Sequence, residues 1–333
     1  MKIAVLGCGG WGLAIAVLLH SNGHTVTAWG RDSARFRTLR ETRTSEKLLP
    51  GVTLPGEIEL TSELACVKGC DLVVLAVPSY AVADLAAELQ PLLASGQVLV
   101  LLSKGFDRSR GYCLLSDTLE QLLPHNPVVA LTGPSHAEEV ARHIPTAVLA
   151  ASKDAAAAEL TQSAFMGDSF RVYTSPDIVS AELGGAMKNI MALAVGISDG
   201  AGFGDNTKAA LMTRGIAEMA RLGRWLGGRT ETFSGLSGVG DLIVTCISDH
   251  SRNRRCGLLI GAGASVQEAI AQVGAVVEGY YATEAIHMLT RDAGLDMPIS
   301  AAMYRLLFEG TSVDDIRHDL LGRDRKAEPE FWR

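Results

Sequence analysis

Short apolar runs alternate with amphipathic stretches along the first half of the chain. The runs are rich in β-branched residues and are bounded by Gly, Pro or Asp, which is typical of buried strands. Between them, apolar positions recur at helical spacing in residues 13–20, 81–93 and 155–165. This alternation predicts a parallel sheet with helices on both faces. The expected strands are residues 3–6, 25–29, 72–77, 98–102, 128–131, 146–150 and 170–173.

The pattern changes after about Pro176, beyond which we expect helices and no strand. Asn206 and Ser265 are the expected N-caps of two of these helices. The fold class is therefore predicted to be α/β, with a Rossmann-like doubly wound parallel sheet followed by an all-α C-terminal domain. The two domains are expected at residues 1–176 and 177–333. The expected helices of the second domain are residues 177–197, 206–226, 266–273, 283–293 and 300–308.

Composition agrees with two globular domains and narrows the class of partner. The chain has 333 residues, of which 47% are hydrophobic, so it can bury substantial cores. Its formal net charge of −7 argues against nucleic acid or an anionic membrane as the main partner. The six cysteines are scattered without metal-ligand spacing, so we expect neither disulfides nor a metal site. No segment is expected to offer the ~18 apolar residues of a membrane span, which predicts a soluble, cytoplasmic protein.

A glycine-rich motif follows the first expected strand and opens the first expected helix. Gly7, Gly9 and Gly12 form a G-x-G-x-x-G pattern that includes Gly10 and Trp11. In this context the first glycine permits a tight turn and the second lets the backbone approach a pyrophosphate. The third allows close packing of helix on strand, and the helix N-terminus supplies amide donors. The motif predicts dinucleotide binding, with an ordinary Gly-rich turn as the alternative.

Charged residues beyond two of the expected strands bear on the ligands. Arg31 can pair with a 2′-phosphate and favours NADP, whereas Asp32 can bind the ribose 2′-hydroxyl of NAD. We expect NADP as the preferred cofactor and NAD as the alternative. If Arg31 is an ordinary solvated arginine, it indicates no preference between the two cofactors. Lys104 lies just beyond the strand at residues 98–102, where open α/β sheets bind ligands, and an exposed loop lysine without a ligand is the alternative.

Lys188 and Asn189 interrupt an otherwise apolar helix in the second half. An unpaired buried ammonium is costly, so Lys188 should have a partner or face a cavity. Gly184 and Gly185, one turn earlier, indicate close approach of another group. We interpret that group as a substrate, with Lys188 as proton donor, and a neighbouring helix is the alternative. Asp241 follows a Gly-rich loop and is a candidate partner for Lys188.

A basic cluster occupies residues 251–255 of this acidic protein. Its three arginines, Arg252, Arg254 and Arg255, provide forked donors that suit an anion, and we expect a phosphate. A solvated helix face is the alternative.

Together these segments resemble the bacterial NAD(P)-dependent glycerol-3-phosphate dehydrogenase family. The resemblance runs through nearly the whole chain, and the order and spacing of the motifs make it specific. The family often has histidine where this chain has Asp32. The motifs are Gly7-x-Gly-x-Trp-Gly12, Leu49-Pro-Gly, Ser103-Lys-Gly-Phe, Gly133-Pro-Ser-x-Ala-Glu-Glu, Glu182-Leu-x-Gly-Ala-x-Lys-Asn, Gly240-Asp-Leu-x-x-Thr, Ser251-Arg-Asn-Arg-Arg and Val277-Glu-Gly.

The resemblance implies an enzyme that converts dihydroxyacetone phosphate into sn-glycerol 3-phosphate for glycerophospholipid synthesis. It also implies that Lys188 is the proton acceptor of the family. The implied cofactor contacts are Gly10, Trp11, Arg31, Lys104, Ala137, Arg252, Val276 and Glu278. The implied substrate site consists of Lys104, Gly133, Ser135, Lys188, Asp241, Ser251, Arg252 and Asn253.

Residue chemistry and resemblance combine into one expected mechanism. Lys188, oriented by Asp241, donates a proton to the reduced ketone, while Lys104 and Asn189 polarise its carbonyl. The substrate phosphate is held by Arg252 and Asn253, and this remote binding positions C2. The alternatives are another two-domain NAD(P)-dependent hydroxyacid or sugar-acid dehydrogenase and a non-catalytic NADP sensor. The apolar helices of the second half are compatible with a homodimer or with packing inside one chain.

Overall fold

A computed structural model of the chain describes residues 1–325 and 327–328. These residues form two compact units. The first unit comprises residues 1–107 and 113–178, and the second comprises residues 108–112 and the chain from residue 179 onward. The short segment 108–112 therefore leaves the first unit and belongs to the second. We call residues 108–112 the excursion; the predicted single boundary at residue 176 did not include it.

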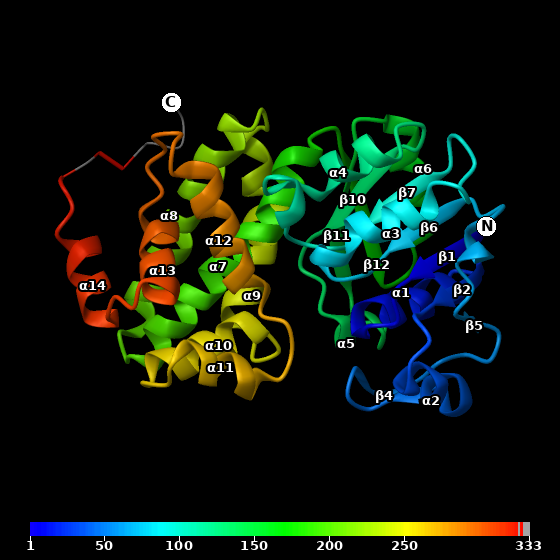
Figure 1. Ribbon diagram of the computed structural model, residues 1–333, viewed down its shortest axis with the longest axis horizontal. Helices are drawn as coiled ribbons and strands as arrows, with labels where there is room; N and C mark the ends of the chain where they lie inside the picture. Colours follow the sequence, from blue (N-terminus) through cyan, green and yellow to red (C-terminus); the bar gives the residue numbers. More distant parts are fainter. Residues whose placement is uncertain (326, 329–333) are drawn as a thin grey trace. The chain divides into compact units, whose positions relative to one another are not determined.

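An eight-stranded sheet is the central layer of the first unit (Figure 1). The spatial order of its strands is β12-β11-β10-β7-β6-β1-β2-β5. The first six of these strands in sequence thus run outward from β1 in both directions, which is the doubly wound Rossmann order. The predicted fold class is confirmed. The strands are β1 (Lys2–Leu6), β2 (Thr25–Trp29), β5 (Glu59–Thr61), β6 (Leu72–Leu75), β7 (Val98–Leu101), β10 (Val128–Thr132), β11 (Thr146–Ala151) and β12 (Phe170–Ser175).

One pair of strands departs from the predicted parallel pattern. β10 and β11 are antiparallel, whereas the other neighbouring strands of this sheet, as described, are parallel. The link between β10 and β11 holds only the short helix α5 (Ala137–Val140), so the chain returns without a crossover and β11 must run in the opposite direction. The edge strand β5 was not predicted, because three residues with polar ends show no apolar run.

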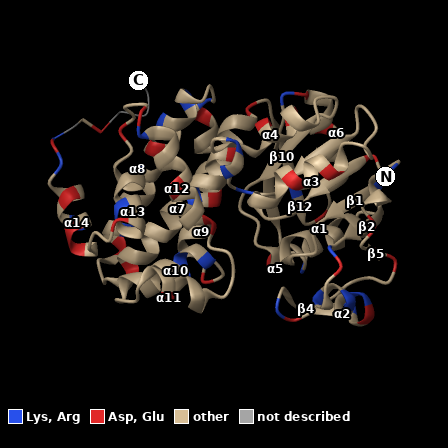
Figure 2. Ribbon diagram, viewed as in Figure 1, with Lys and Arg blue, Asp and Glu red and all other residues tan. Residues whose placement is uncertain are grey.

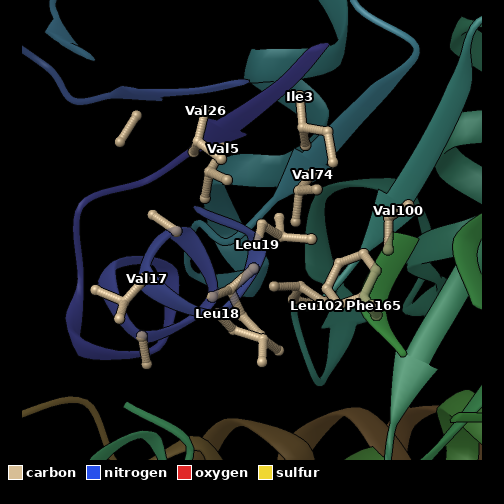
Figure 3. Packing of buried hydrophobic residues seen from close by; sticks show 14 of the residues in the cluster. Ile3, Val5, Val17, Leu18, Leu19, Val26, Val74, Val100, Leu102 and Phe165 are labelled. Carbon is tan, nitrogen blue, oxygen red and sulfur yellow. The ribbon is translucent and has the colours of Figure 1, made fainter. Parts of the chain in front are cut away.

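Both faces of the sheet are covered. Ile3, Val5 and Val74 point to one face, where they join a buried cluster with α1 (Gly10–Ser21) and α6 (Ala155–Phe165) (Figure 3). Ala4 and Leu6 alternate to the other face and are fully buried as well. A second helical layer, in which α3 (Val82–Leu89) packs on α4 (Leu115–Leu122), lies outside that cluster.

Smaller elements complete the first unit and its excursion. They are α2 (Ala34–Thr42), the paired strands β3 (Thr44–Ser45) and β4 (Leu49–Thr53), the paired strands β8 (Phe106–Asp107) and β9 (Cys113–Leu114), and the single turns η1 (Leu64–Val67), η2 (Ser79–Ala81) and η3 (Arg108–Arg110).

The second unit is all-α over its described residues, as predicted. The capping box at Ser265 is present, with the Ser265 hydroxyl accepting from the amide of Glu268. The N-cap predicted at Asn206 is wrong, because Gly202 and Gly204 turn the chain with positive φ and the helix begins before it. The helices are α7 (Ile178–Gly200), α8 (Gly204–Trp225), η4 (Thr230–Ser234), the π-helical turn η5 (Leu236–Gly240), α9 (Asp241–Ile247), α10 (Arg252–Gly261), α11 (Val266–Val273), α12 (Glu278–Thr290), α13 (Pro298–Phe308) and α14 (Val313–Leu321).

Helix α7 corrects one expectation about membrane spans. Its 23 residues are long and apolar enough to cross a membrane, with a mean hydropathy of 1.3 over its most apolar 18-residue window. However, 94% of that window is buried inside the folded protein. The composition of α7 is therefore that of a core helix, and its neighbours include η5, α8 and α10.

Candidate active site

The glycine loop joins β1 to α1 and lies against the end of a neighbouring strand. Gly7 has a φ of +121°, its amide donates to the carbonyl oxygen of Trp29 over 2.9 Å, and a Cβ there would lie 2.6 Å from the carbonyl oxygen of Ala76. A Cβ at Gly12 would overlap the Gly7 carbonyl oxygen. The first and third glycines therefore meet the steric roles predicted for them, a tight turn and close helix packing.

Gly9 is different, because a Cβ there would meet no atom of the described residues within 4 Å. It is the N-cap of α1, and its own carbonyl accepts from the amide of Leu13. The amides of the first turn have no partner inside the helix and point to this open side. The loop thus forms a cradle that fits a pyrophosphate, while Gly10 packs against the carbonyl of Leu48 and Trp11 packs on the core.

The end of β2 carries a net excess of cations. Asp32 accepts from Arg37 of α2 over 2.9 Å, so its carboxylate already has a partner. The Arg31 guanidinium is exposed and lies 3.9 Å from Glu88 of α3. Helix α2 adds further basic residues (Figure 2). This balance suits an anionic group better than a neutral ribose hydroxyl.

Lys104, Gly133 and Ser135 are brought together at one edge of the sheet. β7 and β10 are parallel neighbours, so the loops after them emerge side by side. The carbonyl oxygen of Gly133 accepts from the Ser135 hydroxyl over 3.0 Å and from the Lys104 ammonium over 3.5 Å. Gly133 has a φ of +144°, and a Cβ there would lie 3.0 Å from the Cα of Val148. The turn at Gly133 therefore holds its carbonyl where both side chains reach it.

A buried ion pair joins Lys188 and Asp241 in the second unit. The Lys188 ammonium donates to a carboxylate oxygen of Asp241, and the two side chains are only 9% and 1% exposed. Lys188 thus has the partner that its burial requires. Asp241 opens α9, whose N-terminus favours a carboxylate, and the Thr245 hydroxyl donates back to the Asp241 carbonyl over 2.6 Å.

The amides of Asn189 and Asn253 connect three helices next to this pair. Asn253 donates to the side-chain oxygen of Asn189 over 2.8 Å and accepts from the backbone amide of Gly279 over 2.9 Å. Asn189 donates to the carbonyl of Gly185 over 3.3 Å. The network fixes α7, α10 and the start of α12 around Lys188. Within the described part of the chain, each side-chain amide has one further N–H beyond these hydrogen bonds.

Glycines allow the close approach of the helices that carry these groups. A Cβ at Gly184 would overlap the carbonyl oxygen of Ser237 in η5. The close neighbour of this glycine is thus protein backbone, and the interpretation that a substrate approaches here is wrong for Gly184. Where α7 crosses α10, a Cβ at Gly196 or Gly257 would overlap a backbone carbonyl of the other helix. Small residues therefore bring α9 and α10 near enough for the ion pair and the amide network.

The arginines of residues 251–255 have different environments. Arg254 is paired with Asp199 over 3.0 Å and with Asp249 over 2.7 Å, so its charge is neutralised by the protein. The expectation of three arginines for one anion is wrong for Arg254. Arg252 is exposed at the first position of α10, and the Ser251 hydroxyl caps this helix. An exposed guanidinium beside a helix N-terminus is a combination that can attract an anion.

Two buried or half-buried thiols lie near these groups. Burial raises the pKa of Cys246, on α9, to about 12 even though the charge of Lys188 lowers it. Burial likewise raises the pKa of Cys8, in the glycine loop, to about 12. Both therefore stay protonated at neutral pH. Among the described residues, no cluster of three His, Cys, Asp or Glu side chains could hold a metal ion.

The remaining cofactor residues implied by resemblance lie at or shortly before the starts of helices. Ala137 is the first residue of α5 and packs at the edge of the core. Glu278 is the first residue of α12. Val276 lines a hollow of about 410 Å³ between α11 and α12, together with Tyr280.

The buried carboxylate of Glu218 was missed by sequence analysis. Glu218 of α8 is completely buried and accepts from the backbone amides of Ile299 and Ser300, over 2.5 and 3.1 Å, and from the Ser300 hydroxyl over 2.7 Å. Burial raises its pKa to about 7. In the sequence, Glu218 lies three residues after Gly215 and four before Leu222, on the apolar face of α8, and this spacing could have indicated its burial. It holds the start of α13.

Both halves of the chain match models of one family. The N-terminal model of NAD-dependent glycerol-3-phosphate dehydrogenase matches residues 2–158, and the C-terminal model matches residues 177–318. A glycerol-3-phosphate dehydrogenase (NAD(P)+) of Moorella thermoacetica is 50% identical over 99% of this chain and 98% of its own length. One of Fusobacterium nucleatum is 44% identical over the full length of both chains.

A solved structure agrees with these sequence matches. The crystal structure of glycerol-3-phosphate dehydrogenase from Coxiella burnetii, 35% identical, has a TM-score of 0.92 and covers 97% of this chain and 99% of its own. Because both halves match their family models and the relatives align from end to end, the chain belongs to the NAD(P)-dependent glycerol-3-phosphate dehydrogenase family.

Proposed function

We propose that this chain interconverts dihydroxyacetone phosphate and sn-glycerol 3-phosphate with NADPH or NADH. The observation that carries the proposal is the buried pair of Lys188 and Asp241. A charged ammonium held by a carboxylate can give a proton to the oxygen of a ketone and take it back in the reverse reaction. The exposed Arg252 guanidinium at the start of α10 supports a phosphorylated substrate over the hydroxyacids and sugar acids of the alternative dehydrogenases.

The glycine cradle of the first unit is the proposed cofactor site. Gly7, Gly9, Gly10, Trp11 and Gly12 shape it, and the bound nicotinamide cofactor supplies or accepts the hydride. Family membership supports the further cofactor contacts proposed on the remaining segments, which are Arg31, Lys104, Ala137, Arg252, Val276 and Glu278.

NADP is the proposed preferred cofactor. Asp32, the residue that would bind the 2′-hydroxyl of NAD, is already paired with Arg37. Among the described residues, the ion pair of the exposed Arg31 guanidinium is a 3.9 Å contact with Glu88, which a 2′-phosphate can replace. The Arg31→Ala variant should therefore lose more kcat/KM with NADPH than with NADH.

Proton transfer is the chemistry proposed for Lys188. As negative charge develops on the C2 oxygen, the Lys188 ammonium donates its proton to that oxygen. Asp241 keeps the ammonium charged and oriented beforehand. Lys104, already aimed at the Gly133 carbonyl, is the second cation proposed to polarise the ketone, and Asn189 contributes its remaining N–H. In glycerol 3-phosphate oxidation Lys188 is the proton acceptor.

The substrate phosphate is proposed to bind where α10 begins. Arg252 offers a forked donor, Ser251 caps the helix, and the first-turn amides of α10 favour an anion. Asn253, held by Asn189, contributes its remaining N–H. Binding of this remote phosphate positions C2 for reduction. Family membership supports Gly133 and Ser135 as further proposed substrate contacts.

The experiment that tests the function is the loss of NADPH absorbance with dihydroxyacetone phosphate, repeated with NADH and with unphosphorylated dihydroxyacetone. We expect rapid turnover with the phosphorylated ketone and at least 100-fold lower kcat/KM without the phosphate, since this loses a charged, bidentate contact of about 3 kcal/mol. Equal rates with both ketones would contradict the phosphate site.

Variants of the buried pair test the role of Lys188. The Lys188→Ala variant should lower kcat by about 10²–10⁴-fold, the usual contribution of a general acid, with the Kd for NADPH changed less than threefold. Because this variant removes the counter-charge of the buried Asp241, the double variant Lys188→Ala, Asp241→Asn is the matched control for folding. Wild-type kcat in either variant would exclude Lys188 as the proton donor.

The wider setting of the enzyme is also proposed. Residues 1–176 act as the dinucleotide-binding domain and residues 177–333 as the substrate-binding and catalytic domain, and the product supplies glycerophospholipid synthesis. The six free thiols support a reducing compartment, the cytoplasm. Exposed Ile243 and Ile247, four residues apart on α9, support a homodimer, which light scattering would detect as twice the mass of the chain.

A further inference from the structure

The segment after β7 passes from one unit to the other within a few residues of Lys104. β8 (Phe106–Asp107) still belongs to the first unit, whereas Arg108 opens η3 and belongs to the second. Asp107 and Arg108 are adjacent in sequence but bind to different units. The backbone that carries Lys104 is therefore connected to both.

Asp107 fastens the segment to the first unit. Its carboxylate is buried and accepts from the Thr118 hydroxyl of α4 over 2.8 Å. The Thr118 hydroxyl is also 3.3 Å from the thiol of Cys113, where the chain returns to the first unit. β8 pairs with β9, with Phe106 opposite Leu114. The two ends of the excursion are thus held together on α4.

Arg108 fastens the segment to helix α12. Its guanidinium lies 2.5 Å from the carboxylate of Glu284 and 5.2 Å from the ring centroid of Tyr281. Tyr281 and Glu284 are three residues apart on α12, so they present one surface to the arginine. The first turn of the same helix supplies the Gly279 amide that binds Asn253. Arg108 therefore binds the helix whose start belongs to the amide network beside Lys188.

Solvent exposure limits what this contact can contribute to folding. The side chains of Arg108 and Glu284 are 45% and 26% exposed, and ion pairs of this kind add little to stability. A planar guanidinium that meets a carboxylate and an aromatic ring together does, however, fix both its distance and its direction. The contact therefore restrains the adjoining backbone although it adds little to the free energy of unfolding.

We propose that Arg108 is a positioning residue for Lys104. It ties the segment 104–108 to α12, while Asp107 ties the segment to α4, and Lys104 is thereby held beside the Gly133 carbonyl. The inference rests on the proposed contact of Lys104 with substrate and cofactor. Small displacements of a catalytic group can reduce the rate by 10²-fold, so loss of the anchor should reach kcat without unfolding the protein.

The test is a double-variant cycle of Arg108→Ala and Lys104→Ala, measured as kcat and KM for dihydroxyacetone phosphate. We expect Arg108→Ala to lower kcat by about tenfold in the wild-type background and by less than twofold in the Lys104→Ala background, because its effect passes through Lys104. The Arg108→Lys variant, which keeps the charge but loses the planar fork, should recover part of the loss. The matched control is Arg305→Ala, which removes another exposed pair of the second unit, with Asp319 at 2.6 Å.

Each outcome separates the inference from the function on which it rests. Equal losses from Arg108→Ala in both backgrounds, or a kcat no lower than that of Arg305→Ala, would overturn the positioning role while Lys104 keeps its assignment. Full activity of Lys104→Ala would overturn the assignment of Lys104 and, with it, the role of Arg108. Thermal unfolding of Arg108→Ala and Arg305→Ala should agree within a few degrees, since both pairs are exposed.

Discussion

Replacement of Glu218 by Gln tests how a fully buried carboxylate holds the start of α13. Burial raises the pKa of Glu218 from 4.5 to about 7, against the opposing effect of the three hydrogen bonds that it accepts. Between these two pH values the folded state binds a proton that the unfolded chain has lost. The free energy of unfolding therefore falls as the pH rises from about 4.5 to about 7.

The size of this effect follows from the difference in pKa. One pKa unit corresponds to about 1.4 kcal/mol, so ionisation of Glu218 should lower the stability by about 3 kcal/mol across this interval. A glutamine at the same position accepts hydrogen bonds but does not ionise. The free energy of unfolding of Glu218→Gln minus that of the wild type should thus be about 3 kcal/mol higher at about pH 8 than at pH 4.5.

The assay is urea unfolding, followed by circular dichroism at several pH values between 4.5 and 8. Glu268→Gln is the matched control, because Glu268 also binds a helix N-terminus but is fully exposed and its pKa is lowered by Ser265. Its carboxylate stabilises the fold above pH 4.5, and this contribution is lost as the pH falls through the lowered pKa, which is the opposite sign. Parallel pH profiles for the wild type and Glu218→Gln would refute the reasoning.

Two further predictions concern glycines. Gly9→Ala, whose Cβ would meet open space, should change the free energy of urea unfolding by less than about 0.5 kcal/mol but weaken NADPH binding in a fluorescence titration. Gly12→Ala, whose Cβ would overlap the Gly7 carbonyl, should lower the free energy of unfolding by about 1–3 kcal/mol. Equal stability of the two variants would contradict these steric roles. Gly184→Ala should push back the carbonyl of Ser237, cost a similar 1–3 kcal/mol and lower kcat, and a wild-type kcat would show that the adjacent ion pair tolerates the shift.

Local patterns in the sequence were sufficient for most of the fold and for much of the candidate chemistry. Each strand of the doubly wound sheet except β5 has an apolar run, and the glycine motif has a steric requirement that acts over a few residues. The reversal of β11 was not predictable, because strand direction depends on how the link from β10 packs and not on composition. The excursion of residues 108–112 was likewise hidden, because it depends on contacts of Arg108 with a helix more than 170 residues later.

Predictions for single side chains succeeded where one physical requirement dominated. The burial of Lys188 required a counter-charge, and Asp241 provides it. The arginines at residues 251–255 were interpreted together from their spacing, although Arg254 is neutralised by Asp199, a residue 55 positions earlier. Glu218 was missed because it occupies an apolar position of its helix and the amides it binds come from another element.

Several features around Lys188 lower the stability of the second unit, and packing alone does not require them. Glycine in a helix interior costs about 1 kcal/mol relative to alanine, and α7 carries it at Gly184 and Gly196. A buried ion pair is often no more stabilising than apolar residues of the same volume. Both features nevertheless serve one result, since the glycines admit the backbone of η5 and α10 and thereby place Asp241 and the Asn189–Asn253 amides beside the ammonium. The arrangement agrees with the role proposed for Lys188, because a proton donor must be charged, oriented and shielded from water.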